Sequence, residues 1–454
     1  MNLILLAAGN GRRMKSNLPK VLHEICGRSM ICRVLDITQK LKNLNTTIVV
    51  QKDHNLIKEN INKNIDEKKV FHFAIQNEQL GTGDAVKSAL NHLDNSLFTL
   101  ILYGDVPLIE FKTIKLLCAN LDSNSDVRIL TANVIDPKGY GRVIRNKTKQ
   151  IIKIIEEKDA SGEERKIKEV FAGPLLIKTK VLKKIIRKLS RDNKQNESYL
   201  TDIVRFAAQQ KLKVQSVNLK NEDEMIGVND QSQKIYAEKI FKRRLIDFYQ
   251  NKGLNIIDPE RFDIRGELTF KKNVTIDIGC ILTGKIKLGN NVLVGAYSNL
   301  KNVEAGDNVE IKPYCHIENS KLKKGSSIGP FARLRDQTTI GQNCRVGNFV
   351  EIKNSFLGFG TKASHLSYLG DAKIGKNVNI GAGAITCNYD GINKNITTID
   401  DNVFIGSNSS LVAPIKIKQG ATIGASSCIT EDAPAKSLNV ERNKQTTIKN
   451  WKKK

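Results

Sequence analysis

The sequence predicts two units of different fold class: an α/β unit with a Rossmann-like, mostly parallel sheet, and then an all-β, left-handed parallel β-helix of hexapeptide repeats. Two observations support this division. Up to about residue 225, short apolar runs alternate with segments long enough for helices, which is typical of βαβ units. From about residue 260, aliphatic residues recur at every sixth position, which is the period of stacked hexapeptide coils.

The composition is that of a globular protein large enough to bury extensive cores. The chain has 454 residues, of which 40% are hydrophobic and 26% charged, and its formal net charge is +26. Such an excess of lysine and arginine is compatible with nucleic acid, anionic lipid or phosphorylated small molecules as partners. Because the lysines are spread along the whole chain, we expect mainly solvated surface charge, a polyphosphate substrate and no nucleic-acid partner.

The eight cysteines lie far apart and form no C-x-x-C pair, so the sequence indicates neither a zinc site nor a disulfide framework. The apolar run Leu3–Ala8 is too short for a signal segment, and no later run reaches the roughly 18 apolar residues of a membrane span. We therefore expect a cytoplasmic enzyme without membrane insertion.

Four apolar runs in the first unit are predicted to be strands. They are Leu3–Ala8, Thr47–Val50, Phe71–Ile75 and Phe98–Tyr103. Their continuous rather than alternating hydrophobicity indicates strands that are buried on both faces. Ligands of such a sheet gather beyond the carboxyl ends of its strands.

One amphipathic helix is predicted between the two units, over Asp230–Asn251. Its apolar residues fall at helical spacing among lysines and arginines, and Gly253 follows its end. We therefore expect a first domain over residues 1–228, a helical linker over 229–251, and a β-helix with a carboxy-terminal tail over 252–454.

Two runs of aliphatic residues define the six-residue period. The first consists of Ile328, Leu334, Ile340, Val346 and Ile352, and the second of Ile399, Ile405, Leu411, Ile417, Ile423 and Ile429. Glycine often follows the aliphatic residue, which we interpret as a tight corner between short parallel strands. The register breaks over Asn388–Thr398, where we expect a loop to leave the coil, and long loops inserted into a regular solenoid are commonly functional.

A segment of small residues, Leu6–Gly11, follows the first predicted strand. Its composition lets backbone N–H groups approach phosphate oxygens. The segment satisfies neither the dinucleotide-binding fingerprint nor the P-loop pattern. Arg13 and Lys20 come next, and each could neutralise charge on a transferring phosphoryl group, work for which these side chains are suited.

Two further segments of the first unit carry chemistry at the ends of strands. The side chain of Gln76 and the backbone at Gly81 follow the third predicted strand and could read a nucleotide base. Asp105 follows the fourth strand, where a carboxylate could hold a hard cation that bridges phosphates. We expect Asp105 to be a metal ligand.

In the repeat half, His365 is the best general-base candidate among only six histidines. A neutral imidazole can accept a proton near working pH. An isolated histidine in a solenoid can also be structural, so the residue alone leaves both roles open.

These motifs occur together in an order that resembles one known family. The segments are Leu6–Met14, Pro19–Leu22, Gln79–Gly83, Tyr103–Leu108, Gly139–Arg142 and, in the hexapeptide half, His365–Asp371. The whole chain resembles the bifunctional bacterial N-acetylglucosamine-1-phosphate uridyltransferase/glucosamine-1-phosphate N-acetyltransferase family. The resemblance implies N-acetylation of glucosamine 1-phosphate by acetyl-CoA, and then uridylyl transfer from UTP to N-acetylglucosamine 1-phosphate with release of pyrophosphate.

The resemblance also implies site residues in the first unit. Those that match the site for UTP and UDP-N-acetylglucosamine are Leu6, Ala7, Ala8, Gly9, Lys20, Gln76, Gly81, Thr82, Tyr103, Gly104, Asp105, Gly141, Glu156 and Asn229. Asp105 and Asn229 are implied to share Mg²⁺, and we assign Arg13 a catalytic role. Phe171 stands where the family usually has a sugar-contacting asparagine, so we leave it out of the site.

For the second unit, the resemblance implies that His365 is the catalytic base. Positions that match the sugar-phosphate site are Arg335, Lys353, Tyr368 and Asn379, and positions that match the acetyl-CoA site are Ala382, Asn388, Tyr389, Ser407, Ala425 and Arg442. The family assembles as a homotrimer with acetyltransferase sites between neighbouring coils. Triangular coils offer flat faces suited to such three-fold packing.

Two alternative functions remain open at this stage. One is an enzyme with nucleotidyl activity alone, whose β-helix serves assembly or regulation; the His365 and Tyr368 motif argues against it. The other is a basic RNA-associated scaffold, motivated only by the net charge of +26. Salt-sensitive retention of RNA without turnover of UTP would support the scaffold.

Overall fold

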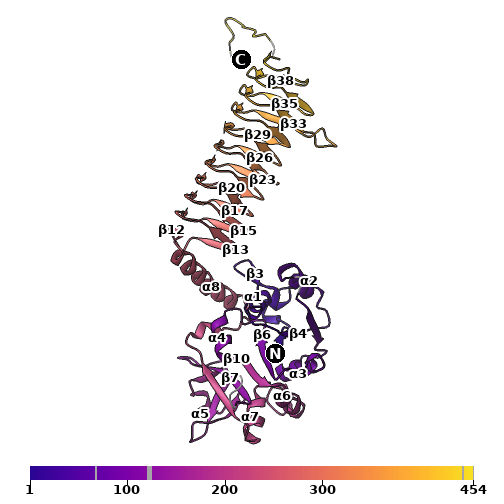
Figure 1. Cartoon of the computed structure of the whole chain (residues 1–454), viewed down its shortest axis with the longest axis vertical. Coiled ribbons are helices and arrows are strands. Elements are labelled where there is room, and N and C mark those ends of the chain that lie inside the picture. The colour runs from indigo at the N-terminus through magenta and orange to yellow at the C-terminus, as the bar shows by residue number, and fades with distance from the viewer. Residues whose placement is uncertain (67–68, 120–124, 442–443, 453–454) are drawn as a thin grey trace. The chain divides into compact units, whose positions relative to one another are not determined.

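The computed structural model describes residues 1–66, 69–119, 125–441 and 444–452 (Figure 1). The chain divides into two compact units, residues 1–241 and 242–454. This division falls inside helix α8 (Gln231–Asn251), which confirms the helix predicted over 230–251 and shows that it contributes residues to both units.

A mixed sheet forms the centre of the first unit, in the order β11-β7-β10-β6-β1-β4-β5. Its strands, with β8 and β9 attached at one side, are β1 (Asn2–Leu6), β4 (Asn45–Val50), β5 (Phe71–Ile75), β6 (Phe98–Tyr103), β7 (Val127–Asn133), β8 (Arg142–Arg145), β9 (Ile151–Ile155), β10 (Glu169–Lys178) and β11 (Val214–Asn218). All four predicted strands are therefore present, with ends that differ by up to two residues.

The expectation of a mostly parallel sheet holds for only part of these strands. The pairs β1–β4, β1–β6, β4–β5 and β7–β11 are parallel, whereas β10 is antiparallel to β6, β7 and β8. Strands β8 and β9 are also antiparallel. The reason is connection length, because the short segment 146–150 between β8 and β9 cannot provide the long crossover that a parallel pair needs.

Helices cover this sheet, and two hydrophobic clusters lie at its faces. The helices are α1 (Met30–Thr38), α2 (Asn55–Asn64), α3 (Thr82–Ser88), α4 (Phe111–Leu117), α5 (Gly162–Arg165), α6 (Thr179–Ile185) and α7 (Asp202–Gln209). The 3₁₀ turns are η1 (Arg12–Met14), η2 (Lys20–Leu22), η3 (Leu90–His92), η4 (Ile186–Lys188) and η5 (Glu222–Met225). A small hairpin pairs β2 (Glu24–Ile25) with β3 (Arg28–Ser29). Alternate residues of β1 enter different clusters, Leu3 and Leu5 in one and Ile4 and Leu6 in the other. Burial on both faces explains why this strand is continuously apolar.

The second unit is a stack of coils whose short strands form long parallel sheets (Figure 1). One sheet contains β12 (Asn255–Ile256), β14 (Thr275–Ile276), β16 (Leu293–Val294), β19 (Glu310–Ile311), β22 (Ser327–Ile328), β25 (Arg345–Asn348), β28 (Lys362–His365), β31 (Asn379–Ile380), β34 (Phe404–Ile405), β37 (Thr422–Ile423) and β39 (Leu438–Asn439). The other contains β13 (Asp263–Phe270), β15 (Ile281–Leu288), β17 (Asn299–Lys301), β18 (Glu304–Ala305), β20 (His316–Glu318), β21 (Lys321–Leu322), β23 (Arg333–Arg335), β24 (Thr339–Ile340), β26 (Glu351–Lys353), β27 (Phe356–Leu357), β29 (Tyr368–Gly370), β30 (Ala372–Ile374), β32 (Ile385–Cys387), β33 (Thr397–Ile399), β35 (Ser410–Val412), β36 (Ile415–Ile417) and β38 (Cys428–Ile429).

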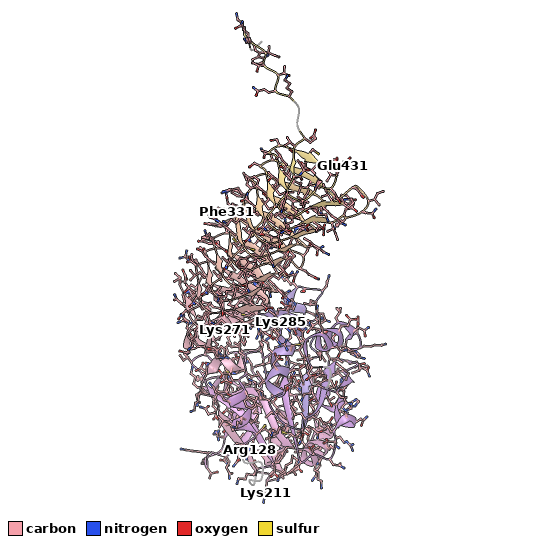
Figure 2. All side chains as sticks on the ribbon, turned by 45° about the horizontal axis from the view of Figure 1, so that its top comes forward. Arg128, Lys211, Lys271, Lys285, Phe331 and Glu431 are labelled. Carbon is pink, nitrogen blue, oxygen red and sulfur yellow. The ribbon has the colours of Figure 1, made fainter. Side chains whose placement is uncertain are left out.

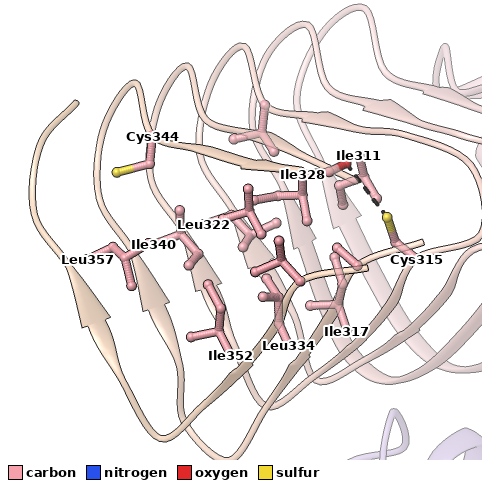
Figure 3. Packing of buried hydrophobic residues seen from close by; sticks show 14 of the residues in the cluster. Ile311, Cys315, Ile317, Leu322, Ile328, Leu334, Ile340, Cys344, Ile352 and Leu357 are labelled. Carbon is pink, nitrogen blue, oxygen red and sulfur yellow. Dashed lines mark hydrogen bonds between the residues drawn. The ribbon is translucent and has the colours of Figure 1, made fainter. Parts of the chain in front are cut away.

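Aliphatic side chains fill the inside of the coil and stack between turns (Figure 3). Ile311 pairs with Ile328, and Ile328 pairs with Val346, so one turn of the coil takes 17 or 18 residues, or three hexapeptides. Every residue of the two predicted aliphatic runs belongs to this buried cluster. The six-residue period is therefore confirmed as the core pattern of the β-helix.

The glycines that follow the aliphatic residues serve mainly the close stacking of one coil on the next. Gly381 and Gly406 lie outside the left-handed region, and a Cβ on either would lie 2.5 Å from a backbone nitrogen of the next coil. Left-handed corner positions are instead often occupied by asparagine, as at Asn343 and Asn377. Asparagine tolerates this conformation, whereas only glycine leaves room for a neighbouring backbone.

A loop leaves the coil where the six-residue register breaks. It follows β32 and returns at β33, and a bridge between Tyr389 and Lys394 closes it into a short hairpin. The excess of basic side chains is dispersed, as the exposed Lys211, Lys271 and Lys285 illustrate (Figure 2). All eight cysteines are free thiols, and none of the described helices is long and apolar enough to cross a membrane.

Candidate active sites

Three polar side chains that are distant in sequence meet at the carboxyl end of β6. The ammonium group of Lys20 donates to Asp105 Oδ2 and to Asn229 Oδ1, the latter over 3.1 Å. The side chains of Lys20 and Asp105 are only 11% and 22% exposed. The backbone N–H of Val228 donates to the carbonyl of Asp105 over 2.9 Å, which explains why the segment before Asn229 runs beside the end of β6.

The segment of small residues after β1 lies against the same group. A Cβ on Gly11, whose φ is +60°, would lie 2.9 Å from the Cβ of Lys20, and a Cβ on Gly9 would lie 3.6 Å from its Cε. Gly104 donates its N–H to the carbonyl of Leu6 over 2.8 Å, which joins the ends of β1 and β6. Leu6, Ala7 and Ala8 are buried behind this loop. The sequence-predicted phosphate loop, Lys20 and Asp105 are therefore brought together.

The donor set at this point fits a divalent cation. Asp105 offers a carboxylate and Asn229 an amide oxygen, and both already face one cationic group, the ammonium of Lys20. The described residues contain no group of three or more histidine, cysteine, aspartate or glutamate side chains that could hold a metal by themselves. Mg²⁺ typically uses one or two protein ligands and completes its shell with phosphates and water, so this small set matches it.

The predicted base-reading residues form a second group next to α3. The side-chain amide of Gln76 donates to the carbonyl of Gly81 over 3.1 Å and to Asp84 over 2.9 Å. Gly81 has φ +103°, and a Cβ there would lie 2.5 Å from the carbonyl oxygen of Ser198. The hydroxyl of Thr82 accepts a hydrogen bond from the N–H of Leu200 over 3.0 Å. The chain around residues 198–200 therefore holds this loop in place.

Tyr103, Gly141 and Glu156 form a third group on the other side of Asp105. Glu156 accepts a 2.8 Å hydrogen bond from the hydroxyl of Thr201, and its Oε2 would lie 3.5 Å from a Cβ on Gly141. Burial raises the pKa of Glu156, because its charged form loses solvation. Burial also raises the pKa of the Tyr103 hydroxyl, and the nearby charges of Glu156 and Asp105 add to this effect. Tyr103 thus lies near both the predicted metal ligand Asp105 and the predicted sugar contact Glu156.

Phe171 and Arg13 are two further residues of the first unit that the sequence analysis named. Phe171 is 8% exposed and belongs to a hydrophobic cluster, while its N–H donates to the carbonyl of Gly141 over 2.8 Å. It therefore offers an apolar ring beside the predicted sugar contacts. Arg13 is exposed in η1, and its side chain has no hydrogen bond or ion pair to another described residue.

In the second unit, cationic side chains gather on one outer face of the coil. The β-ladder register places Arg335 beside Lys353 and Lys353 beside Gly370. Lys353 pairs with Asp371 at 3.3 Å, and the two side chains are 10% and 7% exposed. Arg335 donates to Glu351 over 2.8 Å. Tyr368 lies on the same face, because a Cβ on Gly370 would meet its hydroxyl.

Lys394 joins this group, although the sequence analysis did not identify it. Its side chain contacts Lys353, and this contact and the repulsion between the two charges lower the pKa of Lys394. Asn388, at the start of the same loop, donates to Asp371. The only sequence signal for Lys394 was its position in the loop that interrupts the six-residue period. Arg335, Lys353 and Lys394 thus lie near one another, with the carboxylates of Glu351 and Asp371 among them.

His365 has a partner that the sequence analysis also missed. Its Nδ1 lies 2.7 Å from Oδ1 of Asn348, one coil earlier, and the ladder pairs the two residues directly. An amide oxygen can only accept a hydrogen bond, so this contact requires the proton on Nδ1. The other ring nitrogen, Nε2, then keeps its lone pair at an exposed position.

Three predicted acetyl-CoA residues follow His365 along one corner of the coil. Ala363, Ile380, Ile405 and Ile423 are paired from coil to coil. Two positions after these paired residues stand, in order, His365, Ala382, Ser407 and Ala425. The base candidate is therefore followed by a column of small side chains.

The remaining predicted residues of the second unit lie elsewhere. Tyr389 is 60% exposed in the loop. Asn379 pairs with Lys362 and Phe404 in the sheet of β28, β31 and β34, whereas Tyr368 belongs to the other sheet. Arg442 lies outside the described residues.

Comparison with known proteins identifies both units. A MobA-like NTP transferase domain matches residues 3–198, and a hexapeptide repeat of succinyl-transferase matches residues 396–431. The chain is thus an enzyme that combines a nucleotidyltransferase unit with a hexapeptide acyltransferase unit.

Curated relatives align with this chain over its whole length. Each of three is a bifunctional protein GlmU: that of Legionella pneumophila (strain Lens) is 44% identical over 457 residues, that of Cupriavidus pinatubonensis (strain JMP 134 / LMG 1197) is 42% identical over 453 residues, and that of Ralstonia pickettii (strain 12J) is 42% identical over 453 residues. Each alignment covers 100% of this chain and 98% of the relative. At this identity, and with both units matched in order, the chain belongs to the family of bifunctional GlmU proteins.

Proposed function

We propose that this enzyme makes UDP-N-acetylglucosamine in two steps. The second unit transfers the acetyl group of acetyl-CoA to glucosamine 1-phosphate, and the first unit transfers uridylyl from UTP to N-acetylglucosamine 1-phosphate. The observation that supports this most strongly is the meeting of Lys20, Asp105 and Asn229, because these residues come from three segments and together suit a nucleotide with its cation.

In the first unit, the phosphate of the sugar attacks the α-phosphorus of UTP in line, and pyrophosphate leaves. Gln76 and the Gly81 backbone hold the uracil, and the loop after β1 and Lys20 hold the phosphates. Glu156 and Gly141 hold the sugar nucleotide, with Tyr103 beside them. Mg²⁺ held by Asp105 and Asn229 would neutralise charge on the phosphates. Exposed Arg13 would reach the leaving pyrophosphate from η1.

In the second unit, Nε2 of His365 takes a proton from the amino group of glucosamine 1-phosphate as its nitrogen attacks the thioester carbon. A carbon–nitrogen bond forms, the carbon–sulfur bond breaks, and the thiolate of CoA leaves. Asn348 holds the imidazole in the required tautomer. Arg335, Lys353 and Lys394 hold the sugar phosphate. The column of Ala382, Ser407 and Ala425 leaves room for the extended arm of CoA.

We also propose that the enzyme works as a homotrimer in the cytoplasm. Asn379 and Tyr368 belong to different sheets, so one chain does not enclose all the predicted substrate contacts. Next to His365, a stack of half-exposed rings runs along the coil, formed by Tyr297, Tyr314, Phe331 and Phe349 with centroids 5.0–5.4 Å apart (Figure 2 labels Phe331). Contiguous exposed apolar surface is typical of protein–protein contacts, here with a second copy of the chain.

Two substitutions test both halves of this proposal. Asp105→Ala should abolish release of pyrophosphate from UTP and N-acetylglucosamine 1-phosphate, while thiol release from acetyl-CoA persists. His365→Ala should reduce thiol release by about 10²- to 10⁴-fold, the usual contribution of an acid–base group, while pyrophosphate release persists. His316→Ala, at another exposed histidine of the coil, is the matched control.

The outcomes separate the proposal from its rivals. Near-normal thiol release by folded His365→Ala protein would remove the base assignment, whereas absence of thiol release in the wild type would favour nucleotidyl activity alone. Equal loss of both activities in folded Asp105→Ala protein would contradict the assignment of the two reactions to separate units. Salt-sensitive RNA binding without any turnover of UTP would favour the scaffold.

A further inference from the structure

We propose that the ammonium group of Lys20 occupies the site of the divalent cation until the nucleotide binds. In the nucleotide-free enzyme its ammonium group keeps Asp105 and Asn229 together and competes with metal for them. This inference rests on the proposed nucleotidyl transfer, and it adds an order of events: metal binds tightly only together with the triphosphate.

The contacts of Lys20 differ from those expected of a lysine that only binds phosphate. Its ammonium donates to both predicted metal ligands, and its side chain is only 11% exposed. The stem of Lys20 packs against Gly9 and Gly11, and a side chain on Gly11 would press on it. The lysine therefore lies between the phosphate loop and the metal ligands, within reach of both.

Charge explains why the two cations compete. Asp105 and Asn229 together carry one negative charge, which the ammonium of Lys20 already balances. A divalent ion placed at the same oxygens would stand a few ångströms from that ammonium, and repulsion at such a distance is strong in a partly buried site. A triphosphate relieves this repulsion, because its oxygens attract the ammonium and add ligands for the metal.

The competition makes metal and nucleotide cooperative. The two ligands must raise each other's affinity by the same factor, because such coupling is reciprocal. A lysine that served only as a structural ion pair would make the same contacts without the nucleotide. Its removal would also relieve the repulsion of the metal but would leave UTP affinity unchanged, which distinguishes the two roles.

The first experiment measures binding of Mn²⁺ to the full-length enzyme without nucleotide, by the signal of free Mn²⁺ in electron paramagnetic resonance. Lys20→Met keeps most of the stem and removes the charge, and we expect it to bind Mn²⁺ at least about tenfold more tightly than the wild type. Lys15→Met, the control, removes an exposed lysine that directly follows η1 and should leave the Mn²⁺ affinity unchanged. Adding Asp105→Asn to Lys20→Met should abolish the gain.

The second experiment measures UTP binding without metal, which should be weaker in Lys20→Met than in Lys15→Met. Mn²⁺ affinity in Lys20→Met that does not exceed the wild-type value would overturn the inference, even if UTP binding and pyrophosphate release are normal. An unchanged UTP affinity in Lys20→Met would contradict the proposal that the ammonium group of Lys20 moves from Asp105 and Asn229 to the phosphates when UTP binds. Failure of the wild type to bind UTP would instead overturn the proposed function, while the metal measurement would still decide the competition.

Discussion

Asn348 decides which nitrogen of His365 can accept a proton. Its amide oxygen lies 2.7 Å from Nδ1, and the pairing of β25 with β28 places the two residues side by side. Among the described residues, no other side-chain hydrogen bond or ion pair holds the exposed imidazole, so this single contact fixes both its orientation and its tautomer. Asn348 is therefore a positioning residue for the proposed base.

We expect Asn348→Leu to lower kcat of acetyl transfer by about 10- to 100-fold, a part of the contribution of a positioned acid–base group. The KM for glucosamine 1-phosphate should stay close to the wild-type value, because Asn348 lies outside the cationic group that we propose to hold the phosphate. Asn348→Asp retains an acceptor oxygen and should restore most of kcat. Steady-state measurement of thiol release checks this, and equal losses in both variants would contradict the positioning role.

Glu156 illustrates how a residue proposed to bind a ligand can cost stability. Its pKa is raised by burial, so its ionised form is disfavoured in the folded state. The penalty is absent below the unfolded-state pKa and fully present above the raised folded-state pKa. The pKa of its neighbour Glu157 shifts in the opposite direction, because the hydrogen bond from Arg142 lowers it. The ionised form of Glu157 is therefore favoured in the folded state.

We therefore expect Glu156→Gln to raise the melting temperature of the first unit at pH 8 and to have little effect at pH 4. Glu157→Gln, the matched control, should lower the melting temperature at pH 8, with a difference that shrinks toward low pH. A change of about 1 kcal/mol corresponds to roughly 2–4 °C for a unit of this size. Thermal unfolding at both pH values measures this, and a destabilised Glu156→Gln protein at pH 8 would contradict the sign.

At the scale of elements, the strands of the coil depend on glycines where one turn touches the next. Gly358 follows Leu357 in β27, and a Cβ there would lie 2.5 Å from the carbonyl oxygen of Gly375. Its φ lies outside the left-handed region, so space rather than backbone conformation requires glycine. Asn343 lies in a preceding corner and has φ +56°. At that position backbone conformation, rather than space, limits which residues fit.

We expect Gly358→Ala to destabilise the second unit by about 1–3 kcal/mol, the usual cost of overpacking. Asn343→Gly should be nearly neutral, because glycine adopts positive φ without strain. Urea unfolding of both variants, followed by circular dichroism, compares them directly. A neutral Gly358→Ala variant would show that the coils can move apart at little cost.

At the scale of the whole molecule, α8 belongs to both units. Its first half is held by the first unit, where Phe241 stacks on Arg33 at 3.7 Å and Glu238 accepts from the N–H of Cys26. Its second half enters the β-helix core, where Ile246 and Tyr249 are 2% and 7% exposed. The last turns of the predicted linker are therefore part of the core of the second unit.

We expect a fragment of residues 242–454 to be more stable than one of residues 252–454. The shorter fragment loses burial of Ile246 and Tyr249, which is worth about 3–6 kcal/mol at 1.5–3 kcal/mol for each large side chain. The urea midpoints of the two fragments provide the comparison, and light scattering tests whether either is the trimer that we propose. Equal midpoints would mean that the helix packs without stabilising the coil.

The core of the β-helix and the strands of the first unit could be predicted because local pattern decides them. The six-residue period indicated Ile328, Leu334, Ile340, Val346 and Ile352 as core residues, and all of them are buried. The antiparallel β10 was not foreseen, because continuous apolar runs carry no information on strand direction. The glycines after the aliphatic residues were recognised, but their reason, contact with the next coil, became apparent only from the stacked backbone.

The sequence by itself determined the two fold classes, the interrupting loop and the order of motifs that resembles one family, since each depends on residues close together in the chain. Only the tertiary structure decided which side chains meet. Lys20 lies 85 positions from Asp105 and 209 from Asn229, and His365 meets Asn348 across one turn of the coil. Lys394 contacts Lys353 from the loop that interrupts the coil. Such contacts follow from strand order, ladder register and loop path, which are properties of the assembled fold that no local pattern records.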